Sequence, residues 1–231
     1  MKIIDILNSK KTISFEFFPP KRDSDLPRLY ETVDRLSTYN PDFVSFTYGA
    51  GGNTRQLTTQ VSKEAKLSDK FEVMSHLTCI AHNKTEIINI LKDLTLSNIE
   101  NIIALRGDTP KDMTISKDNL KHATDLIEII KSNFSNFCIA GACYPEFHPE
   151  SNNSVDDIKF TKMKQDKGVD FLITQLFFDN KDFLSFKEKA IMVEKKEAIE
   201  RTMKHHASQC PVHLSIGDSI NITTEIQFKL S

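Results

Sequence analysis

The side chain in this sequence that most suggests chemistry is Glu16, an ionisable group set among phenylalanines in the stretch SFEFFPP at 14–20. In an extended chain alternate side chains share a face, so Glu16 would point the same way as Ser14 and Phe18. If that face lines an apolar cavity, loss of solvation raises the pKa of the carboxyl group, by up to about 3–5 units in full burial. Such a group can hold a proton near neutral pH and deliver it as a general acid. The alternative is an ion pair between Glu16 and Arg106.

Polar groups that could act together with Glu16 follow five further apolar runs of the chain. They are Thr47 and Tyr48, His76 and Thr78, Arg106 and Asp108, Tyr144, Glu146 and His148, and Gln175 and Asp179. Arg106 and Asp108 would share one strand face, so one of them could bind an anion while the other tunes a nearby charge. An internal ion pair between these two residues explains the same spacing equally well.

Two loops between these runs have compositions that permit ligand binding. The turn YGAGGNT at 48–54 would let a ligand approach bare backbone closely, although an ordinary turn between a strand and a helix explains it as well. The loop YPEFHPE at 144–150 gathers a tyrosine, a histidine and two glutamates. Its alternating side-chain directions and two prolines argue against convergence of these groups on one metal ion.

Missing motifs exclude several chemistries. No lysine ends an apolar run, which argues against Schiff-base aldolase chemistry. The GxSxG elbow of serine hydrolases is absent. The glycine-rich turn is neither GxGxxG nor a phosphate-binding loop followed by lysine. The residue types therefore indicate a mixed polar site with one candidate acid.

Six short apolar runs, rich in Val, Ile, Phe and Thr, are predicted as buried strands. They lie at 12–20, 42–50, 72–81, 101–108, 137–145 and 171–179. Between them, stretches such as 26–39, 86–96 and 119–132 carry apolar residues three and four positions apart, which predicts amphipathic helices. Strict alternation of strand and helix predicts a parallel sheet.

The polar strand ends distinguish a barrel from an open sheet. In a barrel the carboxyl ends of all strands converge on one mouth, where barrel enzymes keep their sites. An open sheet concentrates its site on two or three strands. Because all six runs carry polar groups at this end, we predict an α/β fold of the TIM (β/α)8 type. Since only six strands are found, the barrel is expected to be incomplete or to have atypical last strands.

The chain divides into a predicted barrel of six βα units at 1–186 and a C-terminal segment at 187–231. Residues 181–206 are predicted as a long helix. Alternating apolar residues around Gly217 and Asp218 predict half-exposed strands, such as a β-hairpin. Such strands differ from the buried strands of a parallel barrel.

Bulk composition narrows the class of protein. With 30 basic and 32 acidic residues, the net charge is −2, which argues against a nucleic-acid partner and against an anionic membrane surface. No stretch is long and apolar enough to span a membrane, and the first residues lack the apolar region of a signal peptide. The four cysteines form no CxxC pair, which argues against a disulfide framework or a zinc site. These features predict a cytoplasmic protein without a metal centre.

Six segments of the chain resemble, in order and spacing, the methylenetetrahydrofolate reductases, which are flavin-dependent barrel enzymes. The segments are SFEFFPP, DFVSFTYGAGG, HLTC, ALRGD, YPEFHPE and ITQLFFD, all within residues 12–186. The resemblance implies an enzyme of one-carbon metabolism and methionine biosynthesis. In that family FAD carries a hydride from NADH or NADPH to 5,10-methylenetetrahydrofolate, giving 5-methyltetrahydrofolate with ping-pong kinetics. We also expect a homo-oligomer.

The resemblance implies roles for four polar residues. Glu16 matches the acid that protonates the folate as its five-membered ring opens to an iminium. Asp108 matches the carboxylate beside the flavin and the pterin, and it forms the expected catalytic pair with Glu16. Gln175 matches an amide that contacts folate and nicotinamide in turn. Thr47 matches a residue near the nicotinamide and the flavin.

Contacts to FAD are implied for a larger set of residues. They are Thr47, Tyr48, Ala50, His76, Arg106, Gly107, Asp108, Ala123, Tyr144, His148, Asp157 and Lys164. Arg106, His148 and Lys164 suit a pyrophosphate, because they supply hydrogen-bond donors and positive charge. His122 stands where the family often has tyrosine, so a different contact is expected there.

The resemblance ends near residue 188, and the segment 187–231 shows no match to the last two strands of the family. Two further interpretations therefore stay open. The chain could be a non-catalytic flavin- or folate-binding homologue, or a subunit that needs a partner to complete the barrel. It could also be an unrelated barrel lyase in which Glu16 is a general base.

Overall fold

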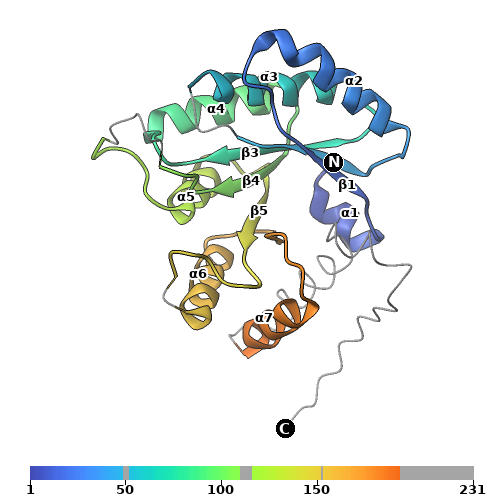
Figure 1. Ribbon diagram of the computed structural model, residues 1–231. Coiled ribbons are helices and arrows are strands. Elements are labelled where there is room, and N and C mark those ends of the chain that lie inside the picture. The colour runs from blue at the N-terminus through green and yellow to red at the C-terminus, as the bar shows by residue number, and fades with distance from the viewer. Residues whose placement is uncertain (49–51, 110–115, 152, 193–231) are drawn as a thin grey trace.

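The computed structural model describes residues 1–48, 52–109, 116–151 and 153–192 (Figure 1). Six parallel strands form one sheet in the order β1-β2-β3-β4-β5-β6, so each strand pairs with its neighbours in the sequence. The strands are β1 (Ser14–Phe17), β2 (Phe43–Phe46), β3 (Glu72–Thr78), β4 (Asn101–Leu105), β5 (Cys138–Cys143) and β6 (Phe171–Thr174). All six predicted strands are confirmed, each within its predicted range.

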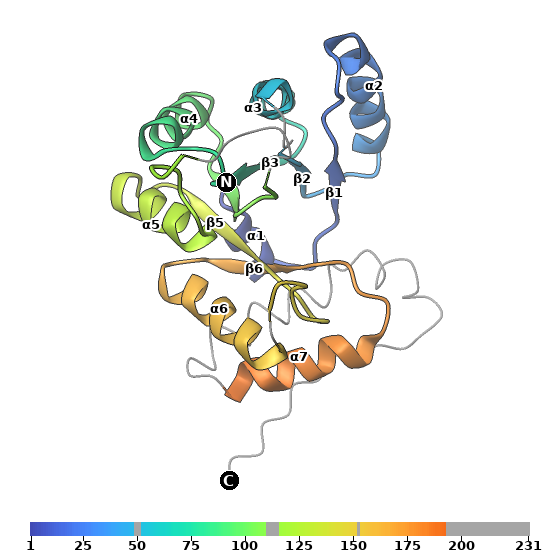
Figure 2. The same ribbon diagram turned by 60° about the vertical axis from the view of Figure 1, so that its left-hand side comes forward.

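The helices are α1 (Ile3–Ser9), α2 (Leu26–Ser37), α3 (Gly52–Leu67), α4 (Lys84–Leu96), α5 (Ala123–Asn133), α6 (Ser154–Asp166) and α7 (Asn180–Met192), with a 3-10 turn at Asp23–Asp25. The helices α2 to α7 cover the outer face of the sheet, whereas α1 precedes β1 and packs against the interior. In α4 the start is fixed by a capping box, in which the Asn83 side chain accepts from the Glu86 N–H and the Glu86 carboxylate accepts from the Asn83 N–H. Figure 2 shows α2 to α7 following one another in an arc around the strands.

The strand pairing defines a half-barrel of the TIM type. Within the described residues β1 pairs only with β2, and β6 pairs only with β5, so the six strands do not close into a cylinder. The predicted fold class, an incomplete barrel, is confirmed.

The predicted boundary at 186 falls inside α7. The predicted helix at 181–206 is described only as far as Met192, and the predicted hairpin lies outside the described residues. No helix in the described ranges is long and apolar enough to cross a membrane.

The outer core lies between the sheet and the arc of helices. Its largest cluster joins β3, β4 and β5 to α4 and α5 through fully buried residues such as Leu91, Ile102, Leu126 and Ile139. Smaller clusters join β1 and β2 to α2 and α3, and β5 and β6 to α6 and α7. Because the outward positions of the strands are used for packing, the alternate inward positions are left to form the interior of the half-barrel.

The interior is closed at the amino ends of the strands by α1. Ile3 and Leu7 of this helix pack against inward residues from several strands, among them Met74, Ile103 and Phe171. The sequence analysis did not predict this helix, because seven residues with three buried side chains give too short a periodic signal. Because α1 forms this floor, the described part of the interior is open at the carboxyl ends of the strands.

Asn101, the first residue of β4, ties α1 to the sheet, and its replacement by alanine is expected to loosen this floor. The side chain is fully buried; its Oδ1 accepts from the Ile3 N–H at 2.7 Å and its Nδ2 donates to the Met1 carbonyl at 3.0 Å. Asn101→Ala leaves the buried Ile3 N–H and the partly buried Met1 carbonyl without this partner, so the free energy of unfolding should fall by about 1–3 kcal/mol. Urea denaturation measures the change.

A matched control for this variant is Asn89→Ala, which removes an exposed amide from the middle of α4. The control should change the free energy of unfolding by less than about 0.5 kcal/mol. Limited proteolysis should cut the first twelve residues faster in Asn101→Ala than in the control. Equal unfolding midpoints for the two variants would contradict the role of Asn101 in holding α1 to the sheet.

Candidate active site

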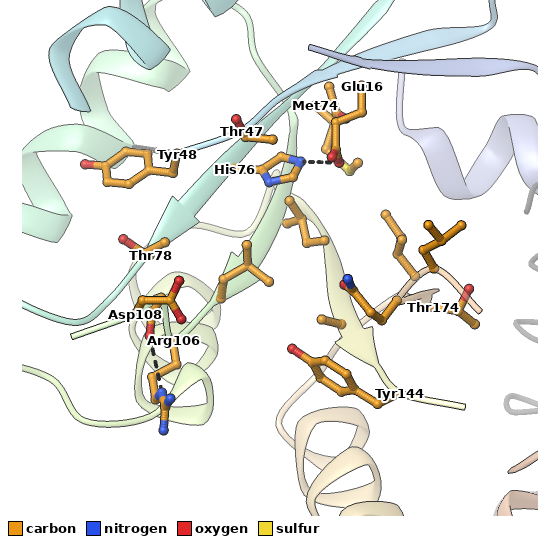
Figure 3. A pocket seen from close by; sticks show the side chains of 18 of the residues that line it. Glu16, Thr47, Tyr48, Met74, His76, Thr78, Arg106, Asp108, Tyr144 and Thr174 are labelled. Carbon is orange, nitrogen blue, oxygen red and sulfur yellow. Dashed lines mark hydrogen bonds and ion pairs between the residues drawn. The ribbon is translucent and has the colours of Figure 1, made fainter. Parts of the chain in front are cut away.

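A cavity of about 550 Å³ opens at the carboxyl ends of the strands (Figure 3). Every strand contributes to its wall, as the sequence analysis predicted for a barrel mouth. The residues that the sequence analysis proposed and that line this cavity are Glu16, Thr47, Tyr48, His76, Thr78, Arg106, Gly107, Asp108, Tyr144, His148 and Gln175. Residues far apart in the sequence are therefore brought together in one place.

Glu16 points into this cavity from β1. The residue opposite it on β2 is Ser45, which shares its register position, and the buried ring of His76 on β3 lies beyond (Figure 3). The distance between His76 Nε2 and Glu16 Oε2 is 3.4 Å, and the Glu16 side chain keeps 51% of its surface exposed. The suggested ion pair with Arg106 is not formed, because the guanidinium of Arg106 pairs with Glu150 instead.

The expectation of a raised pKa for Glu16 is wrong. Hydrogen bonding to His76 lowers the pKa of the Glu16 carboxyl group below its usual value, and the charge of His76 and a hydrogen bond with Ser45 act in the same direction. Partial burial acts in the opposite direction but does not reverse the result. In the polypeptide alone, Glu16 is therefore a carboxylate at neutral pH.

Arg106, Gly107 and Asp108 follow β4 and form the wall opposite Glu16. Arg106 makes a bidentate ion pair with Glu150 from the loop after β5, with 2.7 Å between Nη2 and Oε1. This carboxylate raises the pKa of Arg106 above its ordinary value. The ion pair suggested between Arg106 and Asp108 is not formed, since the two side chains make no contact of ion-pair length in the described residues. Asp108 is exposed at the cavity mouth.

Aromatic and hydroxyl groups from the neighbouring loops complete the wall. The rings of Tyr144 and His148 meet edge to face, with 4.7 Å between their centres, and burial raises the pKa of Tyr144. The backbone of Thr47 is held on both sides, because its N–H donates to Phe17 and its carbonyl accepts from Thr58. Each of these groups is fixed by contacts between elements.

Three residues that the resemblance placed near a cofactor do not line the cavity, and a fourth cannot be placed because it lies outside the described residues. Ala123 is buried at the start of α5, and Ala50 lies outside the described residues. Lys164 donates to the Ala142 carbonyl at 2.7 Å, and burial lowers the pKa of its amine. Asp157 is buried; its Oδ1 accepts from Ser151, while its Oδ2 has no hydrogen-bond partner among the described residues.

Ser45 is a wall residue that the sequence analysis missed. It is 5% exposed, lines the cavity and pairs in register with Glu16. The signal was present in the run DFVSF, since Ser45 lies two positions before Thr47 and alternate residues of a strand share a face. Its position shows that β2 contributes a buried hydroxyl next to the candidate acid.

No group of three or more metal-ligating side chains occurs in the described ranges. In the loop YPEFHPE, the carboxylate of Glu150 is turned to Arg106 and Glu146 is exposed. Cys79, Cys138 and Cys143 are free and buried, and burial raises the pKa of each thiol to about 12.

A half-barrel of parallel strands that gathers polar side chains from every strand at its carboxyl end is the architecture of the barrel enzymes. Within that class the family is shown by sequence. A family model described as methylenetetrahydrofolate reductase matches residues 2–199, and this chain belongs to that family. The match includes the range 12–186 on which the resemblance rested and extends past residue 188, where the recognised motifs end.

Curated relatives agree with the family model. The chain is 37% identical over 185 residues to the 5,10-methylenetetrahydrofolate reductase of Pectobacterium carotovorum, which covers 80% of this chain and 61% of the relative. It is 38% identical over 179 residues to the Escherichia coli enzyme of the same name, covering 78% and 59%. It is 35% identical over 204 residues to methylenetetrahydrofolate reductase (NADH) 1 of Arabidopsis thaliana, covering 80% and 34%. The chain thus spans about three fifths of the length of its bacterial relatives.

Solved structures with similar folds are distant in sequence. One is an uncharacterised protein from Clostridium thermocellum that binds two copies of 5-methyl-5,6,7,8-tetrahydrofolic acid, with a TM-score of 0.57 at 14% identity, covering 82% of this chain and 63% of that one. Another is oxaloacetate acetylhydrolase in complex with an inhibitor, with a TM-score of 0.54 at 9% identity, covering 81% and 67%. At these identities the similarity confirms the barrel-type fold alone.

Proposed function

We propose that this chain catalyses the FAD-dependent reduction of 5,10-methylenetetrahydrofolate to 5-methyltetrahydrofolate, with NADH or NADPH as the hydride donor. One observation carries the proposal: in a chain of this family, Glu16, Asp108 and Gln175 line the same cavity although they lie on β1, after β4 and after β6. The solved relative that binds 5-methyltetrahydrofolic acid supports a folate as the substrate. The activity belongs in cytoplasmic one-carbon metabolism and methionine biosynthesis, and a homo-oligomer stays a prediction.

The residues around the cavity fit FAD. Arg106 and His148 place hydrogen-bond donors at its wall, where a pyrophosphate could accept from them. Gly107 presents backbone to the cavity with no side chain in the way. Bound FAD would accept a hydride from the nicotinamide and pass it to the folate.

The side chains of the cavity have separate tasks in this proposal. Glu16 donates a proton to the folate nitrogen as the five-membered ring opens, and becomes a carboxylate. Asp108, at the mouth, holds the folate and adds negative charge to the site. Gln175 offers both a donor and an acceptor, so it can contact either substrate in turn. Thr47 lies where the nicotinamide would bind.

The decisive experiment for the proposed function is an absorption spectrum of the purified chain reconstituted with FAD. We expect flavin absorbance that is bleached by NADH or NADPH without oxygen and restored by 5,10-methylenetetrahydrofolate. Comparing the two nicotinamides identifies the donor. A protein that takes up no FAD, or that reduces FAD but does not transfer the electrons to the folate, would contradict the proposal.

A second candidate function is a flavin- or folate-binding subunit that needs a partner for turnover. It is favoured by one observation, the open edges of β1 and β6 within the described residues. Flavin binding without turnover in the isolated chain would support this candidate. Turnover by a preparation that sedimentation shows to be monomeric would exclude it.

Glu150 is expected to compete with a bound pyrophosphate for Arg106. Its carboxylate accepts two hydrogen bonds from the Arg106 guanidinium. A phosphate must therefore displace this carboxylate or share the guanidinium with it. Glu150→Gln keeps the size of the side chain and removes the charge, and FAD should then bind about 2- to 5-fold more tightly at low salt. Quenching of flavin fluorescence during a titration measures the affinity.

The control is Glu146→Gln in the same loop. The Glu146 carboxylate is exposed and makes no ion pair in the described residues. This control should leave the affinity unchanged. The gain in Glu150→Gln should shrink as salt is added, because exposed charges are screened. Weaker FAD binding in Glu150→Gln than in the control would show that Glu150 supports the site instead of competing for it.

A further inference from the structure

His76 is the buried basic side chain that faces the candidate acid. The residue lies on β3 and is 6% exposed, whereas the Glu16 side chain across β2 is about half exposed. Its Nε2 lies 3.4 Å from Glu16 Oε2, within ion-pair distance (Figure 3), and this buried nitrogen makes no hydrogen bond in the described part of the chain. The imidazole is therefore the buried partner of this contact, and the carboxyl group is the partner that reaches the open cavity.

A buried ring nitrogen needs a hydrogen-bond partner, because an unpaired polar group loses its hydration without compensation. The tautomer with a proton on Nε2 can donate to the Glu16 carboxyl group. A donor in this position favours the charged form of a carboxyl group. Ser45, which pairs in register with Glu16, lowers the pKa of the Glu16 carboxyl group as well. The local structure thus makes Glu16 a stronger acid than an isolated glutamate.

We propose that His76 is a positioning residue for the proton donor: its Nε2–H holds the Glu16 carboxyl group over the cavity and stabilises the carboxylate that remains after proton transfer. The inference rests on the proposed function. In the transfer, the O–H bond of Glu16 breaks and an N–H bond forms on the folate. The electron pair of the broken O–H bond stays on the carboxyl oxygen of Glu16. His76 neither gains nor loses a proton in this step.

The other titratable groups around the cavity do not explain the behaviour of Glu16. They are Tyr48 after β2, Arg106 and Asp108 after β4, and Tyr144 and His148 after β5. The pKa of Glu16 is lowered by His76 and Ser45, with burial as the opposing cause, and none of the other groups contributes. From β6 as far as residue 192, where the description ends, the cavity is lined by uncharged residues such as Thr174 and Gln175.

The proposal predicts a specific change in pH dependence. Proton donation requires protonated Glu16, so folate reduction must decline as the pH rises through the pKa of this group. His76→Leu removes the donor, and the pKa of Glu16 should rise. The decline should therefore move to higher pH, while the maximal rate falls because the acid is weaker. A histidine that only supports the fold would lower the rate without moving the decline.

Two variants test this prediction in single-turnover experiments, in which reduced FAD is reoxidised by 5,10-methylenetetrahydrofolate at a series of pH values. His76→Leu should lower the maximal rate about 10- to 100-fold, the range for one hydrogen bond to a charged group. His76→Gln keeps an N–H donor near the position of Nε2, so it should restore part of the rate and the pH dependence of the wild type. Rates are expressed per bound flavin, and flavin reduction by the nicotinamide is the internal control.

A direct titration of Glu16 covers the case in which a variant binds no FAD. Carbon-13 NMR of glutamate carboxyl groups in the ligand-free protein, with Glu16→Gln to assign the signal, should give a higher pKa in His76→Leu than in the wild type. If the wild type does not reduce the folate, the proposed function fails. The titration still tests whether His76 lowers the pKa of Glu16. Equal pKa values in the two proteins overturn the inference.

The double variant Glu16→Gln/His76→Leu shows whether His76 acts through Glu16. If it does, the second substitution adds no further loss to folate reduction once Glu16 is removed. If the double variant is slower than Glu16→Gln by the same factor by which His76→Leu is slower than the wild type, the inference is overturned. Such a result would mean that the histidine contributes to the reaction independently of the carboxyl group.

Discussion

Replacement of Glu16 by glutamine should abolish folate reduction while leaving flavin reduction intact. The amide has the size of the carboxyl group and can still accept a hydrogen bond from His76, but it cannot donate an acidic proton. A positioned general acid contributes about 10²- to 10⁴-fold to the rate, so folate reduction per bound flavin should fall by that factor. Reduction of FAD by the nicotinamide needs no such proton and should keep its rate. Stopped-flow absorbance measures the two half-reactions separately.

The matched control is Glu72→Gln on β3. Glu72 lies at the amino end of its strand, where it pairs with Lys66, far from the cavity at the carboxyl ends. It has a lowered pKa like that of Glu16, although with different partners. The control variant should retain both half-reactions. Folate reduction near the wild-type rate in Glu16→Gln would show that another group supplies the proton.

The elements and their faces could be predicted because the local signals are periodic. Each strand range contained an apolar run, and the alternation of side chains agrees with the structure, in which Glu16 lines the cavity and Phe17 packs in the outer core. The convergence of polar strand ends followed from parallel topology alone. Ser45 could also have been found in this way, since it occupies an inner position of β2.

The chemistry of Glu16 could not be predicted in the same way, because its partner is 60 positions away in the sequence and two strands away in the sheet. Neighbouring phenylalanines suggested desolvation, whereas His76 and Ser45 supply hydrogen bonds that favour the charged form. The pairing of Arg106 with Glu150 was missed for the same reason, since the two residues belong to loops after different strands. A local pattern identifies which face a residue takes, but the partner across the cavity depends on register.

The pKa of Glu16 also constrains the mechanism. A carboxyl group with a lowered pKa is mostly ionised at neutral pH, so only a small fraction carries the proton that the folate needs. Binding of folate and flavin over the half-exposed side chain would remove water and oppose this effect, because burial already acts to raise the pKa. The same contact that weakens proton retention makes donation easier once the proton is in place.

Gly107→Ala should destroy the site and destabilise the fold. Gly107 has a φ of +82°, which an alanine adopts only with strain, and an added Cβ would lie 2.8 Å from Thr78 Cβ and 3.1 Å from Ile80 Cγ2. The strain and the overlap together should lower the free energy of unfolding by about 2–5 kcal/mol. Arg106 and Asp108 flank this residue, so any shift of the loop moves both side chains. FAD uptake and the unfolding midpoint should therefore fall together.

Gly168→Ala separates backbone strain from damage to the cavity. Gly168 also has a positive φ, of +106°, but the nearest atoms to its added Cβ belong to the flexible side chain of Lys131, at 2.9 Å from Cε. Gly168 does not line the cavity, so this variant should lose stability through strain alone and keep its FAD affinity. If Gly107→Ala bound FAD as well as Gly168→Ala does, the loop after β4 would not be part of the cofactor site. Both variants strain the backbone at a positive φ. Comparing their FAD affinities therefore tests whether the close approach of Gly107 to Thr78 positions Arg106 and Asp108.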